Sequence, residues 1–439
     1  MAAATIAPAA AQNRPAYFLE NYSYRYQMNP AMGRDGSFDI SMPLLGNFNL
    51  GVTGNVGIDA ILYNRGGKTV LFTHPEVSAS EAMKNIPDRL RLGADIREGI
   101  LSVGFKGLGG YNNISINAVV NAQMRLPGDL FSFVKEGVSN GNYEIGRADA
   151  HLDAYAEIAL NHSHDMGKIL PGLRVGGSVK FLVGIGNVDL NINKADLYLG
   201  TDEWHATTDG EAIVSLGSGF NWSTNEDGQV DNIDMDSFSA PNGYGLAFDL
   251  GATYDWKDFS FALAFNDLGF INWSNTQKAG TNGEHTIRIN DYSINPGNFD
   301  ESLDDLTDDI AELYDLRPST EGAYSRTRAL EATMNASVMY TLPMYTKLTF
   351  GLLNTTRMAH RFAWTDFRLS ANFTPAKWFG MAVNYGIGTF GSSFGWMINL
   401  APKGFNLYFG MDRIPMKFTK DYIPYNANAQ FSFGINFPI

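Results

Sequence analysis

The sequence predicts an all-β fold: a transmembrane antiparallel β-barrel of about fourteen strands, with an N-terminal plug segment and long extracellular loops. Three observations carry this prediction. Apolar residues take every second place along many segments, as from Phe431 to Ile439 in the C-terminal AQFSFGINFPI. The connections between these segments are alternately short and long. No run of about 20 apolar residues offers a membrane-spanning helix.

Composition narrows the class of protein further. The chain has 439 residues, of which 44% are hydrophobic and 18% charged, below the roughly 25% charged residues of soluble domains. Nothing in the composition divides it into separate domains. The formal net charge of -14 argues against nucleic acid as a partner, because such a partner selects a basic patch. The chain has no cysteine, which excludes disulfides and thiolate metal sites.

The first eleven residues are not expected to belong to the fold. Small residues Ala9, Ala10 and Ala11 before Gln12 resemble the end of a secretory signal peptide, so we expect residues 1–11 to be its remainder. An alanine-rich disordered start is the alternative. Residues 12–45 are too many for a simple tail and are expected to form a plug or hatch. The barrel is expected over 46–439.

Fourteen segments have the length and alternation of membrane strands. Most exceed the 5 or 6 residues or so that are usual for strands of soluble proteins. They cover residues 46–58, 89–107, 111–126, 144–162, 173–190, 244–256, 259–273, 326–342, 345–358, 363–373, 380–389, 394–400, 405–418 and 428–437.

Loop lengths follow the parity of the strands. Connections after even-numbered strands are short, whereas those after odd-numbered strands include 59–88, 127–143, 191–243, 274–325 and 419–427. Short periplasmic turns and long external loops are typical of bacterial outer-membrane barrels with an even strand number. The sequence therefore predicts a location in the bacterial outer membrane.

Aromatic residues mark the expected strand ends. Trp256, Tyr345 and Trp378 lie at short turns, and Trp273 and Trp364 lie near the opposite ends. This predicts two interfacial aromatic girdles. A soluble β-sandwich or propeller is the alternative, but it needs neither terminal aromatics nor one-sided loops.

The lumen is expected to be mixed. In FSFALAFNDLGFINW, Phe259 to Phe265 form one apolar face, while Leu268 and Phe270 extend apolar character to the other face, which predicts a partly apolar interior. The last strand instead turns amides and a hydroxyl inward. We expect a kink or bulge at Asp267 and Gly269, and no polar set that converges on one inward position.

Two short motifs carry a resemblance. MNPAMG, with Asn29, Pro30 and Ala31, resembles the N-P-A motif near the mature N-terminus of FadL-like and PorV-like barrels. NDLGFINW (266–273) resembles a motif of a related Bacteroidota family of unknown function. In FadL the N-terminal segment plugs the lumen as a hatch, and hydrophobic substrates leave sideways through a kinked strand. PorV-like members instead are outer-membrane partners of the secretion machinery.

One acidic loop suggests a metal. In STNEDGQVDNIDMD, Asn225, Asp227, Asp231 and Asp234 fall at positions 3, 5, 9 and 12 of an EF-hand-type loop, with Gly228 at the sharp turn. Position 1 is a serine and position 12 is Asp rather than Glu. The sequence thus predicts a calcium site here, and a solvated acidic loop is the alternative.

A histidine pair and an apolar repeat also bear on function. His162, His164 and Asp165 have ligand chemistry for zinc or a similar metal, although a polar turn explains them as well. Apolar residues at helical spacing over 299–313 predict an amphipathic helix that caps the barrel mouth or docks a partner.

No enzyme is predicted. Matches to G-x-S-x-G (137–141 and 391–395) and to G-x-G-x-x-G (386–391) lack the strand–turn–helix context of a catalytic or nucleotide-binding loop.

The expected function is therefore that of a binding or scaffold subunit of an outer-membrane complex, with outer-membrane proteins or lipoproteins and outer-membrane lipid as partners, as the PorV-like resemblance implies. The alternative is FadL-like passive uptake of a hydrophobic small molecule.

Overall fold

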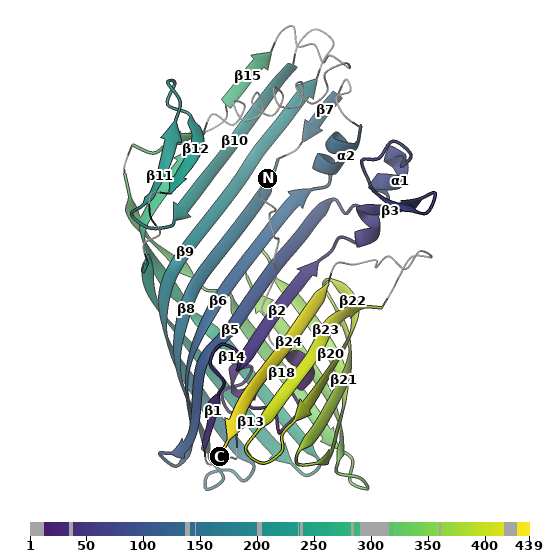
Figure 1. Ribbon diagram of the computed structural model, residues 1–439, viewed down its shortest axis with the longest axis vertical. Helices are drawn as coiled ribbons and strands as arrows, with labels where there is room; N and C mark the ends of the chain where they lie inside the picture. Colours follow the sequence, from purple (N-terminus) through teal and green to yellow (C-terminus); the bar gives the residue numbers. More distant parts are fainter. Residues whose placement is uncertain are drawn as a thin grey trace.

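The computed structural model describes residues 13–34, 38–136, 141–144, 146–199, 204–235, 237, 240–281, 285–289, 316–320, 322–359, 361–416 and 428–439. Within them, fourteen antiparallel strand positions close into one barrel, as predicted (Figure 1). In wall order these are β2 (Asn47–Gly54), β5 (Arg89–Gly107), β6 (Gly110–Pro127), β8 (Ala148–Asp165), β9 (Leu173–Leu199), β13 (Gly243–Trp256), β14 (Phe259–Gly280), β18 (Ala332–Thr341), β19 (Leu348–Met358), β20 (Trp364–Ala376), β21 (Phe379–Gly388), β22 (Gly391–Leu400), β23 (Asn406–Pro415) and β24 (Ala429–Pro438).

The seam between the last and the first strand closes the wall. β24 pairs with β23 on one side and with β2 on the other, where Phe48 faces Phe433. Because each of the fourteen barrel strands described has a neighbour on both sides, this part of the wall has no free strand edge. No helix among the described residues is long and apolar enough to cross a membrane.

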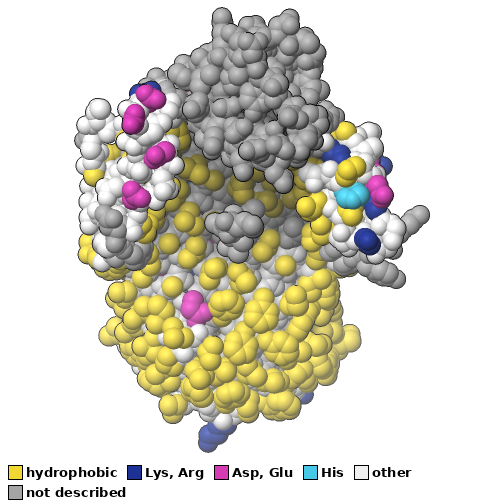
Figure 2. All heavy atoms as spheres, turned by 45° about the horizontal axis from the view of Figure 1, so that its top comes forward, with side chains coloured by type: hydrophobic (Ala, Val, Ile, Leu, Met, Phe, Trp, Pro, Cys, Tyr) yellow, Lys and Arg dark blue, Asp and Glu magenta, His cyan; other side chains and the backbone are white. Residues whose placement is uncertain are grey.

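Alternation gives the barrel an apolar outer belt. Phe270, Leu369 and Phe431 point outward and are 45%, 62% and 41% exposed. Figure 2 shows hydrophobic side chains covering the lower part of the visible face almost continuously. An apolar surface of this extent is unfavourable in water and is what a membrane barrel presents to lipid.

The wall begins earlier than expected. β1 (Phe38–Ser41) pairs with β24 and β5, so it occupies the same wall position as β2. The expected boundary at residue 45 falls in the interruption between the two strands. There Leu44, with a φ of 61°, and Leu45 protrude outward. Backbone bonds from Leu44 to Ile100 and from Ile435 to Leu45 keep this interruption closed.

Three further strands differ clearly from the prediction. The strand expected over 326–342 is split into β17 (Tyr324–Ala329) and β18, and a backbone bond from the Leu330 N–H to the Gly269 carbonyl lies at the break. β9 continues to Leu199 and β14 to Gly280, beyond the expected ends at 190 and 273. The 27 residues of β9 span about 90 Å at ~3.3 Å per residue, far more than a bilayer requires.

The predicted loops 191–243 and 274–325 contain strands of their own, because they continue the wall above the belt. β10 (Trp204–Ser215) fills the position above β13 and pairs with β9 and β14. Figure 1 shows the wall tall on this side and short at β20 to β24. The other outer strands are β7 (Gly141–Glu144), β15 (His285–Ile289), β16 (Arg317–Pro318) and the hairpin β11 (Phe220–Thr224) with β12 (Val230–Met235).

A second outer unit follows β2 in the chain and precedes β5. It comprises η3 (Ile58–Ala60), β3 (Leu62–Arg65), β4 (Lys68–Leu71) and α1 (Ala79–Met83), joined by α2 (Asp129–Glu136). Phe72 and Phe131 pack in its small core, with ring centroids 5.9 Å apart. The helix predicted over 299–313 lies outside the described residues.

Of the two predicted aromatic girdles, only the one at the short turns is found among the described residues. Trp256, Tyr345 and Trp378 are 50%, 44% and 56% exposed near the short turns. Trp273 and Trp364 are 1% and 4% exposed, so both face inward, which contradicts the second girdle. For Trp273 the reason is a bulge that shifts the alternation of β14, described below.

Candidate functional site

The segment 13–34 lies inside the barrel and is called the plug here (dark purple in Figure 1). It contains only two short turns of 3-10 helix, η1 (Arg14–Ala16) and η2 (Arg25–Gln27). Its alternating Tyr22, Tyr24 and Tyr26 are buried, and the Tyr22 ring lies 4.8 Å from that of Tyr408 in the wall. The plug therefore has an aromatic core with the wall rather than a regular backbone of its own.

Wall amides supply the hydrogen bonds that the plug backbone lacks. The side-chain amide of Asn266 donates to the carbonyl of Gln27 at 2.8 Å, and that of Asn335 donates to the carbonyl of Met28 at 3.0 Å. Asn399 and Asn406 both donate to the carbonyl of Asn21. Since buried carbonyls need partners, this pattern explains why the lumen wall is rich in asparagine.

The N-P-A motif seats the plug against wall glycines. Asn29 accepts a bond from the Ala31 N–H at 3.0 Å and donates to the carbonyls of Ala252 and Leu263. A side chain at Gly176 would collide with Pro30, and one at Gly251 with Asn29. Because these glycines have no side chain, the N-P-A motif packs closely against the wall.

A β-bulge lies where the sequence suggested a kink. Asp267 has a φ of 61°, and the register between β13 and β14 shifts here. Both Asn266 and Asp267 consequently point inward, and the residues from Leu268 to Trp273 change face. Leu268 and Phe270 face outward, so the expectation that they line the interior is wrong. Gly269 packs against Ala247 without room for a side chain.

The bulge holds a buried charge cluster, which contradicts the expectation that no polar set converges inward. The Lys180 ammonium lies 2.6 Å from Asp267, 2.9 Å from Asp249 and 3.6 Å from Glu157. Arg97 pairs with Glu157 at 2.9 Å. The Asp267 N–H also donates to Asp249. Asp267 is thus held by Lys180 of β9 and Asp249 of β13, and Glu157 of β8 and Arg97 of β5 extend the cluster.

Beside this cluster lies an inward-facing apolar patch, a second part of the lumen wall. Its members come from five wall strands and the break at Leu330: Val119, Tyr155, Leu182, Ala247, Ile271, Trp273 and Leu330. A cavity of about 40 Å³ is lined by Val119, Tyr155 and Leu330 of this patch together with charged groups that include Arg97, Asp267 and Arg357. Apolar and charged side chains thus meet at this cavity.

A larger cavity lies at the end of the barrel that carries the short turns. It measures about 950 Å³ and lies between the plug and the wall, where Phe18, Arg25, Arg174, Asp255 and Lys377 contribute to its lining. Small-molecule pockets commonly measure about 300–1,000 Å³. The plug therefore leaves space on this side.

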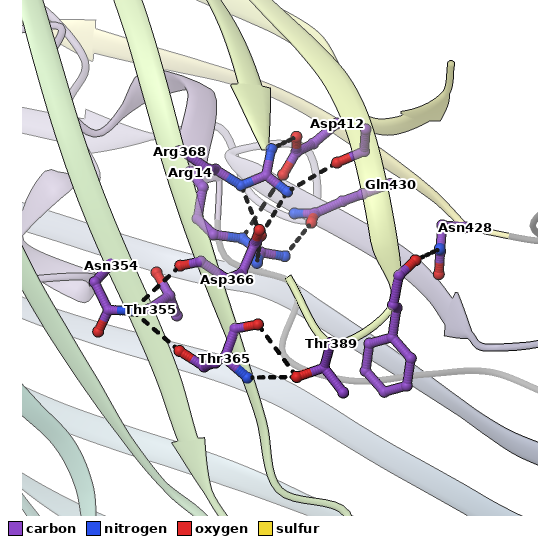
Figure 3. A network of polar contacts seen from close by, with 12 residues as sticks. Arg14, Asn354, Thr355, Thr365, Asp366, Arg368, Thr389, Asp412, Asn428 and Gln430 are labelled. Carbon is purple, nitrogen blue, oxygen red and sulfur yellow. Dashed lines mark hydrogen bonds and ion pairs between the residues drawn. The ribbon is translucent and has the colours of Figure 1, made fainter. Parts of the chain in front are cut away.

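The start of the plug is held by ion pairs, as Figure 3 shows. Arg14 lies 3.0 Å from Asp366 and also bonds Gln430. Arg368 contacts Asp366 at 2.7 Å and pairs with Asp412. Sequence reasoning missed this network. The available signals were Trp364, Asp366 and Arg368 at alternating places, and two adjacent charges, Asp412 and Arg413, within a strand.

The acidic loop forms a tight hairpin turn, and calcium binding by it stays a prediction. Asn225, Asp227 and Gly228 lie in the tight turn of the β11–β12 hairpin, whereas Asp231 and Asp234 lie along extended β12. The Asn225 side chain caps the turn instead. Among the described residues, no group of three or more His, Asp or Glu side chains is placed to hold a metal ion.

The two histidines suggested as zinc ligands lie on β8. The rings of His162 and His164 lie 5.6 Å apart, and His162 bonds Asn112. Neither belongs, with Asp165, to a metal-binding group in the described part of the chain.

Residues 30–412 match the model of a family of unknown function, DUF5723. No curated protein sequence matches the chain.

Several solved barrels are similar. The Ralstonia pickettii toluene transporter TbuX is 10% identical, with a TM-score of 0.41, over 94% of this chain and 92% of that one. The P. putida toluene transporter TodX is 8% identical, with a TM-score of 0.42, over 95% and 93%. A Pseudomonas aeruginosa FadL homologue is 10% identical, with a TM-score of 0.37, over 95% and 94%. Likeness at this level says nothing of activity.

Proposed function

The chain belongs to the DUF5723 family of unknown function, and we propose that it is a bacterial outer-membrane barrel for passive uptake of hydrophobic small molecules. The observation that carries the proposal is the apolar patch around Trp273, which faces the lumen rather than the lipid. A barrel that only has to stand in a bilayer needs apolar residues outside and polar residues inside. The side chains of this patch are packed against one another, with Trp273 only 1% exposed, and an apolar ligand fits between them when the plug or the bulge moves.

The surroundings of the patch offer a route. Trp273 and Leu330 lie beside the bulge at Asp267 and the break between β17 and β18, where the sheet has few backbone bonds. The cavity of about 950 Å³ lies on the other side of the plug. A ligand on the patch thus reaches this space by local movement of the plug or of the bulge, without a continuous aqueous pore.

The plug accounts for the closed state of the lumen. Wall amides, the N-P-A contact and the Arg14 ion pairs hold it in place, so an open porin is the wrong description. The scaffold role that we expected first would also suit a filled lumen, but nothing in the comparisons supports it. Outer-membrane protein or lipoprotein partners remain a prediction.

Photolabelling tests the proposal directly. The purified barrel in lipid nanodiscs is irradiated with a diazirine-bearing alkylbenzene, and labelled residues are identified by mass spectrometry. We expect labels on Leu182, Ile271 or Trp273 that excess toluene removes, and outer labels, as on Phe270, that toluene leaves unchanged.

Two variants sharpen the test. Trp273→Asp should remove the competed labels, whereas Leu369→Ala, a change on the lipid face, should keep them. Labelling confined to outward residues, with no competition by toluene, would overturn the uptake proposal. Stable partner proteins in the same purification would then favour the scaffold role.

A further inference from the structure

One acidic residue of the barrel wall faces the lipid. Glu98 lies on β5, where it pairs directly with Phe48 of β2 and with Ala118 of β6. Its neighbour Arg97 points inward to the charge cluster, so the alternation of the strand turns Glu98 outward. Phe48 points outward as well, since its ring centroid lies 6.4 Å from that of the outward Phe431. Glu98 therefore interrupts the apolar belt.

Glu98 lies at a depth where the bilayer is apolar. β24 has ten residues, about the number that a membrane strand requires, and Phe433 is near its middle. The register joins Phe433 to Phe48 and Phe48 to Glu98, which places the carboxyl within the belt. The outward residues Leu50 and Ile96 beside it are apolar. Figure 2 shows an acidic side chain among hydrophobic ones on the visible face.

The described part of the barrel gives this carboxyl no partner. Oε1 of Glu98 is buried without a hydrogen bond, and no ion pair joins Glu98 to a cation among the described residues. An ionised carboxylate in hydrocarbon is costly, and ionisable groups at this depth usually pair with another polar group. A neutral carboxyl left alone there also forfeits its hydrogen bonds. The partner of Glu98 must therefore come from outside the barrel.

The outer surface next to Glu98 is formed by small side chains. Ala118 pairs with Glu98 on one side and with Ala156 of β8 on the other. Ala154 also points outward, because Tyr155 between the two alanines belongs to the inward apolar patch. Small residues allow two membrane proteins to approach closely. This face can thus bring a second protein within hydrogen-bond reach of the carboxyl.

We propose that this face binds a second copy of the barrel, with the two Glu98 side chains paired across a two-fold axis. A neutral carboxyl has both a donor and an acceptor, so it is complementary to itself. In a two-fold dimer each surface meets its own copy. Both copies stand in the membrane in one orientation, so the two Glu98 residues lie at the same depth.

Symmetry also favours this occupant over the others. Acyl chains of lipid offer neither a donor nor an acceptor at this depth. An unlike membrane protein would have to carry a matched polar group at the same depth, whereas a second copy carries it without further requirements. The inference is independent of the proposed uptake function.

Crosslinking through a single cysteine tests the dimer. The chain has no cysteine, so Ala118→Cys adds a unique thiol beside Glu98. The full barrel is refolded into vesicles at increasing ratios of lipid to protein and treated with a short bismaleimide. We expect covalent dimers whose yield falls as lipid dilutes the barrel. Leu369→Cys, a lipid-facing thiol on β20, which is not a neighbour of β5, measures random encounters and should give few dimers.

Substitutions of Glu98 in the Ala118→Cys chain separate carboxyl pairing from general apolar adhesion. Glu98→Leu removes the donor and the acceptor and should weaken the dimer about tenfold or more. It also makes the lipid face more apolar, so insertion should not suffer. Glu98→Gln keeps a donor and an acceptor in one amide and should retain the dimer.

Two results would overturn the proposal. One is a dimer of unchanged affinity in Glu98→Leu, which would show that the carboxyl does not hold it. The other is a barrel that stays monomeric at every ratio of lipid to protein, which would leave lipid or an unlike membrane protein as the occupant of this face.

Discussion

Asn266 clamps the plug to the wall at the same place where β14 bulges. Its side-chain amide donates to the carbonyl of Gln27 at 2.8 Å, and the next residue, Asp267, accepts from Lys180 at 2.6 Å. A regular strand would turn only one of these two neighbours inward. The extra residue of the bulge therefore lets one strand hold the plug and anchor the charge cluster together.

Asn266→Ala should loosen the plug. It leaves the Gln27 carbonyl buried without its donor, a loss of about 1–3 kcal/mol. Hydrogen exchange should then rise within 13–34 while the wall strands stay protected. Asn112→Ala is the matched control, because Asn112 is a buried wall amide that bonds His162 and not the plug. Equal exchange of the plug in both variants would show that Asn266 does not hold it.

Arg14→Met should destabilise the protein by about 3–5 kcal/mol, because it removes one partner of a buried ion-pair network. Arg65→Met removes a more exposed pair with Glu81 and should cost about 1 kcal/mol or less. Urea unfolding in detergent measures both losses. The double variant Arg14→Met with Asp366→Asn should recover part of the loss. Similar losses in the two single variants would argue against a tight network.

Deletion of Asp267 should still allow the barrel to form. The bulge contains one residue too many, so its removal leaves Phe265 and Leu268 facing lipid and Trp273 facing the lumen. Lys180 keeps Asp249 as its partner. Deletion of Leu268, a change of the same size, instead turns Asp267 toward lipid or reverses the faces beyond it. Refolding yields in detergent should differ accordingly, and two equal yields would contradict the assigned faces.

Alkaline pH should release the plug. Burial raises the pKa of Tyr26 to about 12 and that of Tyr24 well above 10. Their protonated forms stabilise the seated plug fully below pH 10, the pKa of an exposed tyrosine, and this stabilisation is lost as the pH rises through the folded values. Phenolate absorbance during a pH titration should therefore rise together with plug exchange.

A single hydroxyl provides the control for this titration. The Tyr24 hydroxyl has no hydrogen-bond partner among the described residues. Tyr24→Phe should leave stability at neutral pH nearly unchanged and move plug release to higher pH. An unchanged release pH would exclude Tyr24 as its cause.

The sequence predicted the wall well because lipid imposes a strict rule. Outward residues such as Leu369 and Phe431 must be apolar over the whole belt, so period two reveals each strand. Above the belt this rule ends. β10 therefore lacked the signal, and its position follows from pairing with the long β9.

The interior was harder to predict for two reasons. A bulge shifts the phase of a strand, and without its position Trp273 appears to face lipid. The adjacent polar pairs Asn266–Asp267 and Asp412–Arg413 are the sequence signal for the bulges at Asp267 and Arg413. Contacts of the plug, such as Arg14 with Asp366, join residues 352 positions apart, and no local pattern encodes them.

Influx of radiolabelled naphthalene into Gram-negative cells that express the barrel tests the uptake function most directly. We expect faster influx than in cells with an empty vector, a return to that baseline with Trp273→Asp, and normal influx with Leu369→Ala when equal amounts of barrel are at the cell surface. Influx no faster than the empty vector, with the barrel correctly inserted, would contradict it.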